Sequence, residues 1–158
     1  MILPDPTPQQ AADMVAISRL AVSYSEAICR SAIDEAVLVY ADDGVLASAT
    51  TEDAVGREAI AALIRETTKG FEFLFQTTHG GLVQVDGDRA WARFPTTEWV
   101  KQPDGTGRQF LGTYEDEIVR TAEGWRFQRR FLHGLTLGRV ESFARSRTHP
   151  IAGPSLTL

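Results

Sequence analysis

Between Thr78 and Gly134 the sequence contains three long runs of β-forming residues, and this stretch constrains the fold more than any other. Short glycine-containing segments separate the runs, at residues 86–88, 102–107 and 123–124. Aspartate and glycine between extended runs are typical of tight turns that join antiparallel strands. The sequence therefore predicts an antiparallel meander of long strands.

The residues before this stretch show helical spacing. Thr7 has the features of an N-cap, with Pro8 in the first turn and Gln10 placed to complete a capping box. The expected helices span 7–28, 33–40 and 56–70, and the expected strands span 45–47, 75–85 with a bend at 80–81, 89–101 with a bulge or an edge at Pro95, 108–120 and 125–135. Helices followed by a meander indicate an α+β architecture with helices on one face of the sheet.

Length and composition favour a single domain. The 158 residues, 43% of them apolar, provide one substantial core. We expect one domain over 1–158, with a loose lead-in at 1–6 and a C-terminal extension at 139–158 that forms a helical turn or straps across a neighbour. A net charge of −5 argues against nucleic acid as a partner. No signal sequence or long apolar run is present, so we expect a cytoplasmic protein that does not bind membranes.

The cysteine and histidine content bounds the chemistry. Cys29 is the single cysteine, which excludes an intrachain disulfide and a cysteine-based metal cluster. His79, His133 and His149 are too widely spaced to predict a metal site. We therefore expect neither a metal nor a cofactor.

The order of elements and several strings resemble the SnoaL-like branch of the NTF2-like superfamily over roughly residues 10–137. The strings are 24–45, 56–60 (Gly-Arg-Glu-Ala-Ile), 85–90 (Val-Asp-Gly-Asp-Arg-Ala), 112–116 (Gly-Thr-Tyr-Glu-Asp) and 123–127 (Glu-Gly-Trp-Arg-Phe). The resemblance implies a cone, in which N-terminal helices pack on the concave face of a strongly curved antiparallel sheet around a pocket. This superfamily includes polyketide cyclases, scytalone dehydratase, hexachlorocyclohexane dehydrochlorinase and small subunits of ring-hydroxylating dioxygenases, so the fold does not determine the reaction.

The resemblance implies that His79 is the general base, since it matches the catalytic histidine of scytalone dehydratase and of the dehydrochlorinase. A histidine near neutral pKa is suited to proton abstraction. The alternative is a hydrogen-bonded structural histidine at a strand end. In those enzymes an aspartate orients the histidine, and alignment puts Cys29 at its place. A thiol is a poor acceptor, so Cys29 is either a buried small residue beside the apolar stripe of its helix or, less in keeping with its type, a nucleophile whose thiolate His79 would favour.

Four further residues are candidates for the site. Arg130 matches a pocket arginine of the dehydrochlorinase and would steady negative charge, or it is a surface ion-pair partner. Leu132 shares its strand face. Tyr114 would donate a hydrogen bond to an oxyanion or serve as a core residue. Asp116 would replace the missing aspartate or pair with Arg130 or Arg93.

The leading hypothesis is a cofactor-independent lyase, isomerase or cyclase that performs a dehydratase-like proton transfer on a small apolar molecule. Here His79 and Arg130 would be catalytic, and Cys29, Tyr114, Asp116 and Leu132 would bind the substrate. The alternatives are a non-catalytic protein that binds a hydrophobic ligand and the small subunit of a ring-hydroxylating dioxygenase. We also expect a homo-oligomer, a dimer or a trimer, with Trp91 and Trp99 on the outer face of the sheet.

Overall fold

The computed structural model describes residues 4–140 and has the predicted α+β architecture. The helices are α1 (Pro8–Cys29), α2 (Ile33–Ala36), the 3-10 turn η1 (Val37–Val39) and α3 (Arg57–Thr68). The strands are β1 (Tyr40–Ser48), β2 (Ala54–Val55), β3 (Phe73–Thr78), β4 (Leu82–Asp86), β5 (Arg89–Lys101), β6 (Gly107–Thr121) and β7 (Gly124–Val140). Most of the predicted C-terminal extension, residues 141–158, lies outside the described residues.

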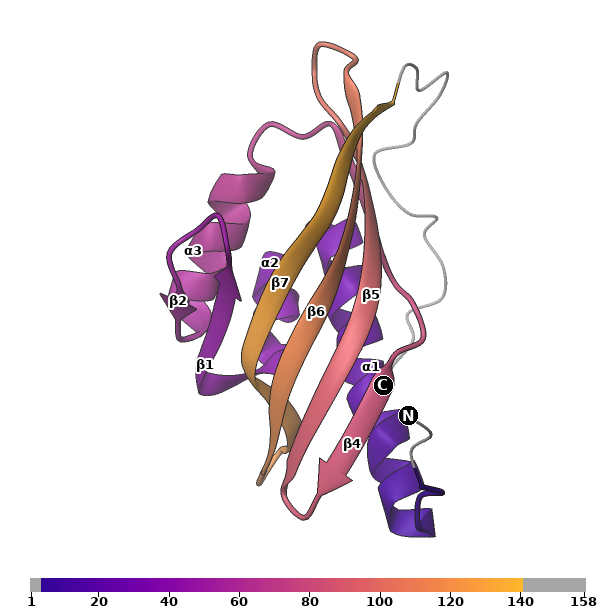
Figure 1. Cartoon of the computed structure of the whole chain (residues 1–158). Helices are drawn as coiled ribbons and strands as arrows, with labels where there is room; N and C mark the ends of the chain where they lie inside the picture. The colour runs from indigo at the N-terminus through magenta and orange to yellow at the C-terminus, as the bar shows by residue number, and fades with distance from the viewer. Residues whose placement is uncertain (1–3, 141–158) are drawn as a thin grey trace, which may run out of the picture.

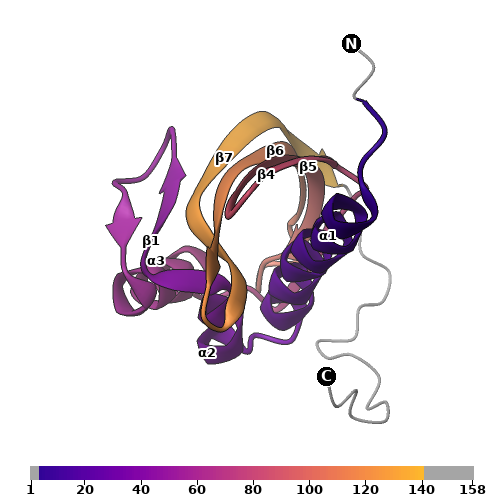
Figure 2. The same ribbon diagram turned by 90° about the horizontal axis from the view of Figure 1, so that it is seen from below.

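The strands form one curved sheet of seven strands in the order β2-β1-β7-β6-β5-β3, and β4 also pairs with β5. Figure 1 shows β5, β6 and β7 side by side as the long antiparallel meander, with α1 behind them. The pairing of β1 with β7 is parallel, which joins the N-terminal half of the chain to the meander. Seen from below, the sheet curves toward the side on which α1 lies (Figure 2). The predicted cone is thus confirmed.

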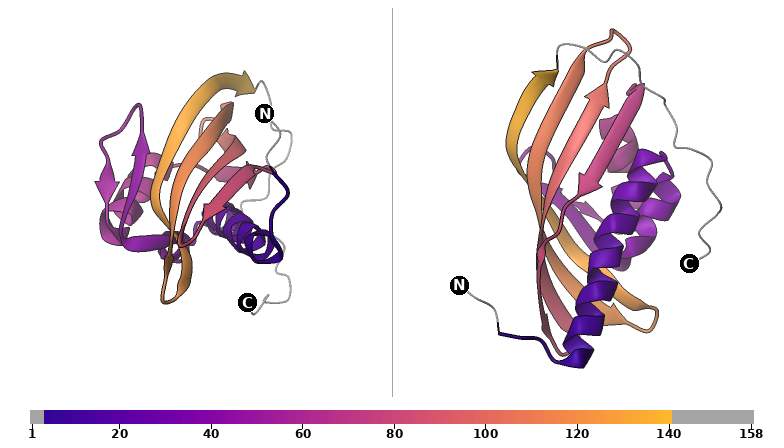
Figure 3. Two further views of the ribbon diagram at one scale, coloured as in Figure 1. Left: turned by 60° about the horizontal axis from the view of Figure 1, so that its bottom comes forward. Right: turned by 90° about the vertical axis from the view of Figure 1, so that its right-hand side faces the viewer.

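Helix α1 begins at the predicted capping box and lies along one face of the sheet (Figure 3). Its buried stripe includes Ile17 and Ala21. Near its start the buried Asp13 accepts hydrogen bonds from Trp125 Nε1 (3.0 Å) and Arg120 Nη2 (2.8 Å). These two hydrogen bonds lower the pKa of Asp13 from 3.8 to about 2, and the bond from Arg120 has the larger effect. Asp13 therefore fastens α1 to the hairpin between β6 and β7.

The structure corrects the expected long strand over 75–85, which is two short strands, β3 and β4, on the same side of β5. The break includes Gly81, where an added Cβ would lie 2.3 Å from the carbonyl oxygen of Arg93. Pro95 causes no bulge, because β5 keeps one register with β6 from Arg89 to Lys101. The backbone carbonyl of Pro95 accepts a hydrogen bond from the backbone N–H of His79, at the break between β3 and β4. The backbone N–H that proline lacks would face this break too, so its absence does not disrupt the pairing of β5 with β6.

Two further boundaries differ from the prediction. Strand β7 continues to Val140 instead of ending near residue 135, which lengthens the meander. The second helix is shorter than expected, because Tyr40 already belongs to β1. None of the helices within residues 4–140 is long and apolar enough to cross a membrane.

Candidate functional site

A cavity of about 440 Å³ lies between the inner face of the sheet and the C-terminal ends of α1 and α3. Alternate residues of β5 and β6 point into it, because successive side chains of a strand face opposite sides of the sheet. Its walls are mainly apolar and include Ile28, Leu46, Leu63, Phe71, Leu74 and Val100. We call this cavity the inner pocket. Among the described residues that line it, two carry a formal charge, Glu98 and Arg108.

A chain of polar side chains holds Glu98 in place. Gln76 Nε2 donates to Glu98 Oε1 (2.7 Å) and lies 3.5 Å from Tyr114 Oη, while the Ser25 hydroxyl donates to Gln76 Oε1 (3.0 Å). Gln76 and Ser25 are buried. Because Ser25 occupies the amide oxygen, the amide nitrogen is directed at Glu98, and the carboxyl group keeps one orientation within the pocket.

The pocket environment favours the neutral forms of its acids. Burial raises the pKa of Glu98, and the hydrogen bond from Gln76 offsets part of this rise. Burial also raises the pKa of the phenols of Tyr24 and Tyr114. Both phenols therefore keep their protons and can donate hydrogen bonds, and Glu98 is an acid whose affinity for a proton is increased. Such a carboxyl group is suited to proton transfer.

Beneath the inner pocket lies a buried ion pair between Arg130 and Asp116. Arg130 Nε lies 2.9 Å from Asp116 Oδ1, and Nη2 lies 3.2 Å from Oδ2, with both side chains fully buried. The guanidinium also lies against the rings of Tyr114, Phe127 and Tyr24, at 3.9, 4.2 and 4.8 Å from their centroids. Arg130 thus supports the tyrosines from below and does not line the pocket.

Phe110 forms part of the pocket wall near a pair of glycines. Gly112 and Gly134 are cross-strand partners at an irregularity in the pairing of β6 with β7. A Cβ at Gly112 would lie 2.6 Å from the Phe110 ring, and one at Gly134 would lie 3.2 Å from it. The glycines let the ring lie close to the sheet, and this leaves the space above it open.

The structure does not place His79 in the inner pocket, contrary to the expectation from the resemblance. Its exposed ring hydrogen-bonds through Nε2 to the Thr97 hydroxyl (2.8 Å). The reason is the strand alternation: Thr78 faces α1, where its hydroxyl meets Ser25, so the next side chain faces outward. A catalytic role for His79 stays a prediction from the resemblance, and the geometry favours Glu98 as the proton-transfer group of this pocket.

The other predicted residues fall into two groups. Tyr114 and Leu132 line the inner pocket. Asp116 pairs with Arg130 below it, and Cys29 lies beside it, with Sγ hydrogen-bonded to the amide and carbonyl groups of Gln76 at 3.1 and 3.2 Å. Burial raises the pKa of the Cys29 thiol. This direction disfavours the thiolate, and hence the nucleophile alternative.

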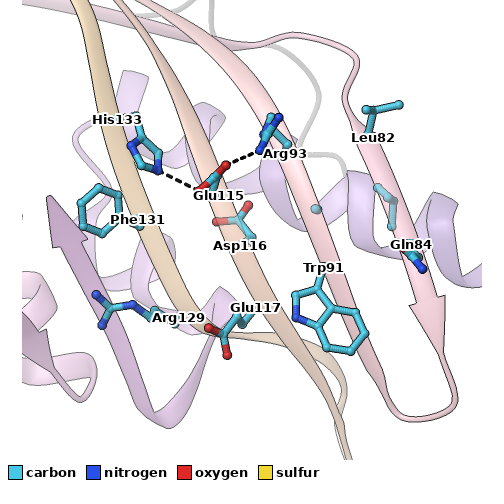
Figure 4. A pocket seen from close by; sticks show the side chains of 12 residues that line it. Leu82, Gln84, Trp91, Arg93, Glu115, Asp116, Glu117, Arg129, Phe131 and His133 are labelled. Atoms are coloured by element: carbon cyan, nitrogen blue, oxygen red, sulfur yellow. Dashed lines mark hydrogen bonds and ion pairs between the residues drawn. The ribbon is translucent and has the colours of Figure 1, made fainter. Parts of the chain in front are cut away.

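A second hollow, of about 590 Å³, lies on the outer face of β4 to β7 (Figure 4). There Glu115 accepts from Arg93 and lies 2.8 Å from His133 Nε2. Trp91, which is 42% exposed, lies at the other end of the hollow, on the outer face as predicted. Because Glu115, Arg93 and His133 already bind one another on an exposed surface, we take the inner pocket as the candidate site.

Within residues 4–140, no group of three or more histidine, cysteine, aspartate or glutamate side chains has an arrangement that could hold a metal ion.

A curved sheet, a long helix along it and an internal cavity between them define a conical α+β domain. Similar solved structures include an NTF2-like protein with a cystatin-like fold from Novosphingobium aromaticivorans (26% identity, 80% of this chain and 84% of that chain, TM-score 0.71). A scytalone dehydratase-like protein from the same organism has 19% identity, coverages of 94% and 99% and a TM-score of 0.77. Hexachlorocyclohexane dehydrochlorinase LinA-type3 from Novosphingobium barchaimii has 12% identity, coverages of 87% and 97% and a TM-score of 0.79.

Residues 9–131 match the SnoaL-like domain, and the chain belongs to this family. No curated protein matches the sequence.

Gln76, Glu98 and Arg108 are among the residues of the inner pocket that sequence reasoning missed. A bulge at Pro95, one of the two expectations from the sequence, leaves it open which face of the sheet Glu98 occupies. Had β5 been taken as continuous, the alternation of Thr96, Glu98 and Val100 would have placed all three on one face. For Gln76 and Arg108 the sequence offers the same alternation and no motif.

Proposed function

We propose that this protein is a cofactor-independent lyase, isomerase or cyclase that moves a proton on an apolar small molecule in the inner pocket, with Glu98 as the proton-transfer group. The observation that carries the proposal is the carboxyl group of Glu98, held by Gln76 in an apolar cavity that raises its pKa. The names of two structural neighbours, a dehydrochlorinase and a scytalone dehydratase-like protein, support elimination chemistry in a pocket of this shape.

The reaction begins with ionised Glu98. Its carboxylate removes a proton from a carbon next to a carbonyl group or next to a carbon that carries a leaving group. The electron pair of the broken C–H bond then moves onto the carbonyl oxygen as an enolate, or forms a double bond as the leaving group departs. Tyr114 and Tyr24 keep their protons and donate hydrogen bonds to the developing negative charge. Glu98 can return the proton at another position, which completes an isomerisation.

A general test of this proposal is deuterium exchange, which needs no knowledge of the natural substrate. 1-Tetralone is an apolar bicyclic ketone with exchangeable protons beside its carbonyl group. In D₂O the wild-type protein is expected to speed their exchange above the buffer rate, as followed by proton NMR. Glu98→Gln keeps the side-chain shape and removes the base, so the rate should fall by at least about 100-fold.

The control is Glu117→Gln, which removes a carboxylate from the outer face of the sheet and should leave the exchange rate unchanged. The wild-type rate is also expected to rise with pH up to a pKa above that of an ordinary glutamate, because the ionised carboxylate is the base. Equal rates for wild type and Glu98→Gln, or no exchange above buffer with wild type, would contradict the proposal.

Two observations favour a second function, that of a non-catalytic ligand-binding protein. His79 lies outside the pocket, and Cys29 stands where the resemblance places an aspartate. Under this alternative the inner pocket binds apolar molecules without reaction, and wild type and Glu98→Gln both leave the deuterium exchange of 1-tetralone at the buffer rate. The exchange assay thus separates the two functions.

A further inference from the structure

Two arginines lie side by side at the open end of the inner pocket. Arg108 on β6 lines the pocket, and Arg139 on β7 is its direct cross-strand partner. Residues directly opposite in an antiparallel pair project from the same face of the sheet. Neither guanidinium has a hydrogen bond or an ion pair with any residue in 4–140. Hydrogen bonds from Thr106 lower the pKa of Asp104, and the charge of Arg139 adds a small part to this lowering.

Like charges directly opposite each other on two strands destabilise the sheet. The other arginines of the meander have partners: Arg93, Arg120, Arg126, Arg129 and Arg130 each have a carboxylate, and Arg89 lies over the ring of Trp91. An anion between Arg108 and Arg139 would remove the repulsion. A carboxylate fits this position, since two guanidinium groups can each offer it paired N–H donors.

The position of this arginine pair relative to Glu98 restricts the ligand further. Glu98 is the cross-strand partner of Phe110, which lies two residues from Arg108 on the same face of β6. Two residues of a strand span about 7 Å. A ligand with its acid group at Arg108 would therefore lay an apolar body over Phe110 and bring its inner end to Glu98, Gln76 and Tyr114.

We propose that the inner pocket selects mainly apolar carboxylic acids, whose carboxylate binds between Arg108 and Arg139 at the open end while the apolar body extends inward over Phe110. The inference deepens the proposed function, on which it rests for the use of the same pocket, and it names the substrate class. It also assigns Arg108 as the residue that determines specificity for charge.

The test compares two probes of the same size and shape, the anion 2-naphthoate and the neutral amide 2-naphthamide, by isothermal titration calorimetry at low ionic strength. The wild-type protein is expected to bind the acid about 10-fold more tightly than the amide. Arg108→Gln should weaken binding of the acid by about 5- to 10-fold and leave the amide within about 2-fold, and Arg139→Gln should act in the same direction. Added salt should reduce the preference of the wild-type protein.

The matched control is Arg65→Gln, which removes an exposed arginine of α3 that pairs with Asp34. It alters the net charge equally and should leave both affinities unchanged. The proposal is overturned if the acid and the amide bind equally well, if neither binds, or if Arg65→Gln weakens the acid as much as Arg108→Gln does.

The outcome is separable from that of the proposed function. If 1-tetralone exchange is absent but the acid preference depends on Arg108, the proton-transfer function fails and the acid site stands. If exchange depends on Glu98 but the two probes bind alike, the acid site fails and the function stands. Glu98→Gln should retain the preference for the acid in either case.

Discussion

Replacement of Asp116 by Asn would test whether the buried pair with Arg130 supports the floor of the inner pocket. The variant keeps the shape of the side chain but leaves the Arg130 guanidinium without a counter-ion. Both side chains are fully buried and share two hydrogen bonds. Hydrogen bonds to charged groups contribute about 1.5–3 kcal/mol each, and loss of one partner of a buried pair costs about 3–5 kcal/mol. We therefore expect the free energy of unfolding to fall by about 3–5 kcal/mol.

The assay is urea denaturation followed by tryptophan fluorescence, with the same slope required for each variant. The double variant Asp116→Leu/Arg130→Met removes both charges and should recover most of the loss, because no unpaired charge remains. A variant Asp116→Asn that loses less than about 1 kcal/mol would refute the reasoning. So would a double variant that is less stable than Asp116→Asn. If Asp116→Asn does not fold, folding of the double variant decides the question.

Two further predictions concern α1 and the pocket wall. Asp13→Asn should lower stability at pH 7 by about 2 kcal/mol, since the shift of the pKa from 3.8 to about 2 is worth that amount. Because its pKa is lowered, the Asp13 carboxylate stabilises the fold above the unfolded pKa, and this stabilisation is lost as the pH falls from about 4 to 2. In urea titrations at about pH 4 and about pH 2, the difference in free energy of unfolding between wild type and Asp13→Asn should shrink at the lower pH. The control is Asp88→Asn, which removes an exposed partner of Arg120 and should cost less than about 0.5 kcal/mol. Gly112→Ala should weaken 2-naphthoate binding by about 10-fold in calorimetry, because the added Cβ would lie 2.6 Å from the Phe110 ring and push it into the pocket. The additional change Phe110→Ala should recover part of this loss, since the Cβ would also lie 2.8 Å from the backbone carbonyl oxygen of His133. Unchanged binding would show that the ring does not move.

The sequence predicted those parts of the fold that depend on local signals. The capping box at Thr7 and the turn residues around β5 gave the start of α1 and both ends of that strand. The parallel pairing of β1 with β7 was not predictable in this way, because it joins residues about eighty positions apart and leaves no local pattern. The predicted strand over 125–135 is shorter than β7, because Gly134 and Gly138 are residues typical of a turn.

The candidate site was predicted less well than the fold. The resemblance together with strand alternation placed Tyr114 and Leu132 on the pocket face, and both line the inner pocket. The resemblance placed His79 in the pocket, whereas in the structure Thr78 faces α1 at the end of β3 and the His79 side chain faces outward. Arg130 was expected to line the pocket, but it is buried against three aromatic rings. This burial depends on tertiary packing, which the spacing of residues in the sequence does not show. The family resemblance was sufficient to predict a pocket between the helices and the sheet. The identity of the residues that line it could be established only from the register of the strands.

The hydrogen-bonded chain that orients Glu98 also bears on how the protein folds. Its links join residues separated by 51, 22 and 38 positions, from α1, β3, β5 and β6. Closing such long loops is entropically unfavourable until the strands have paired, so no short fragment can hold this arrangement. We expect the catalytic geometry to be acquired late on the folding pathway, and binding of a pocket ligand to report the arrival of the fully assembled native state.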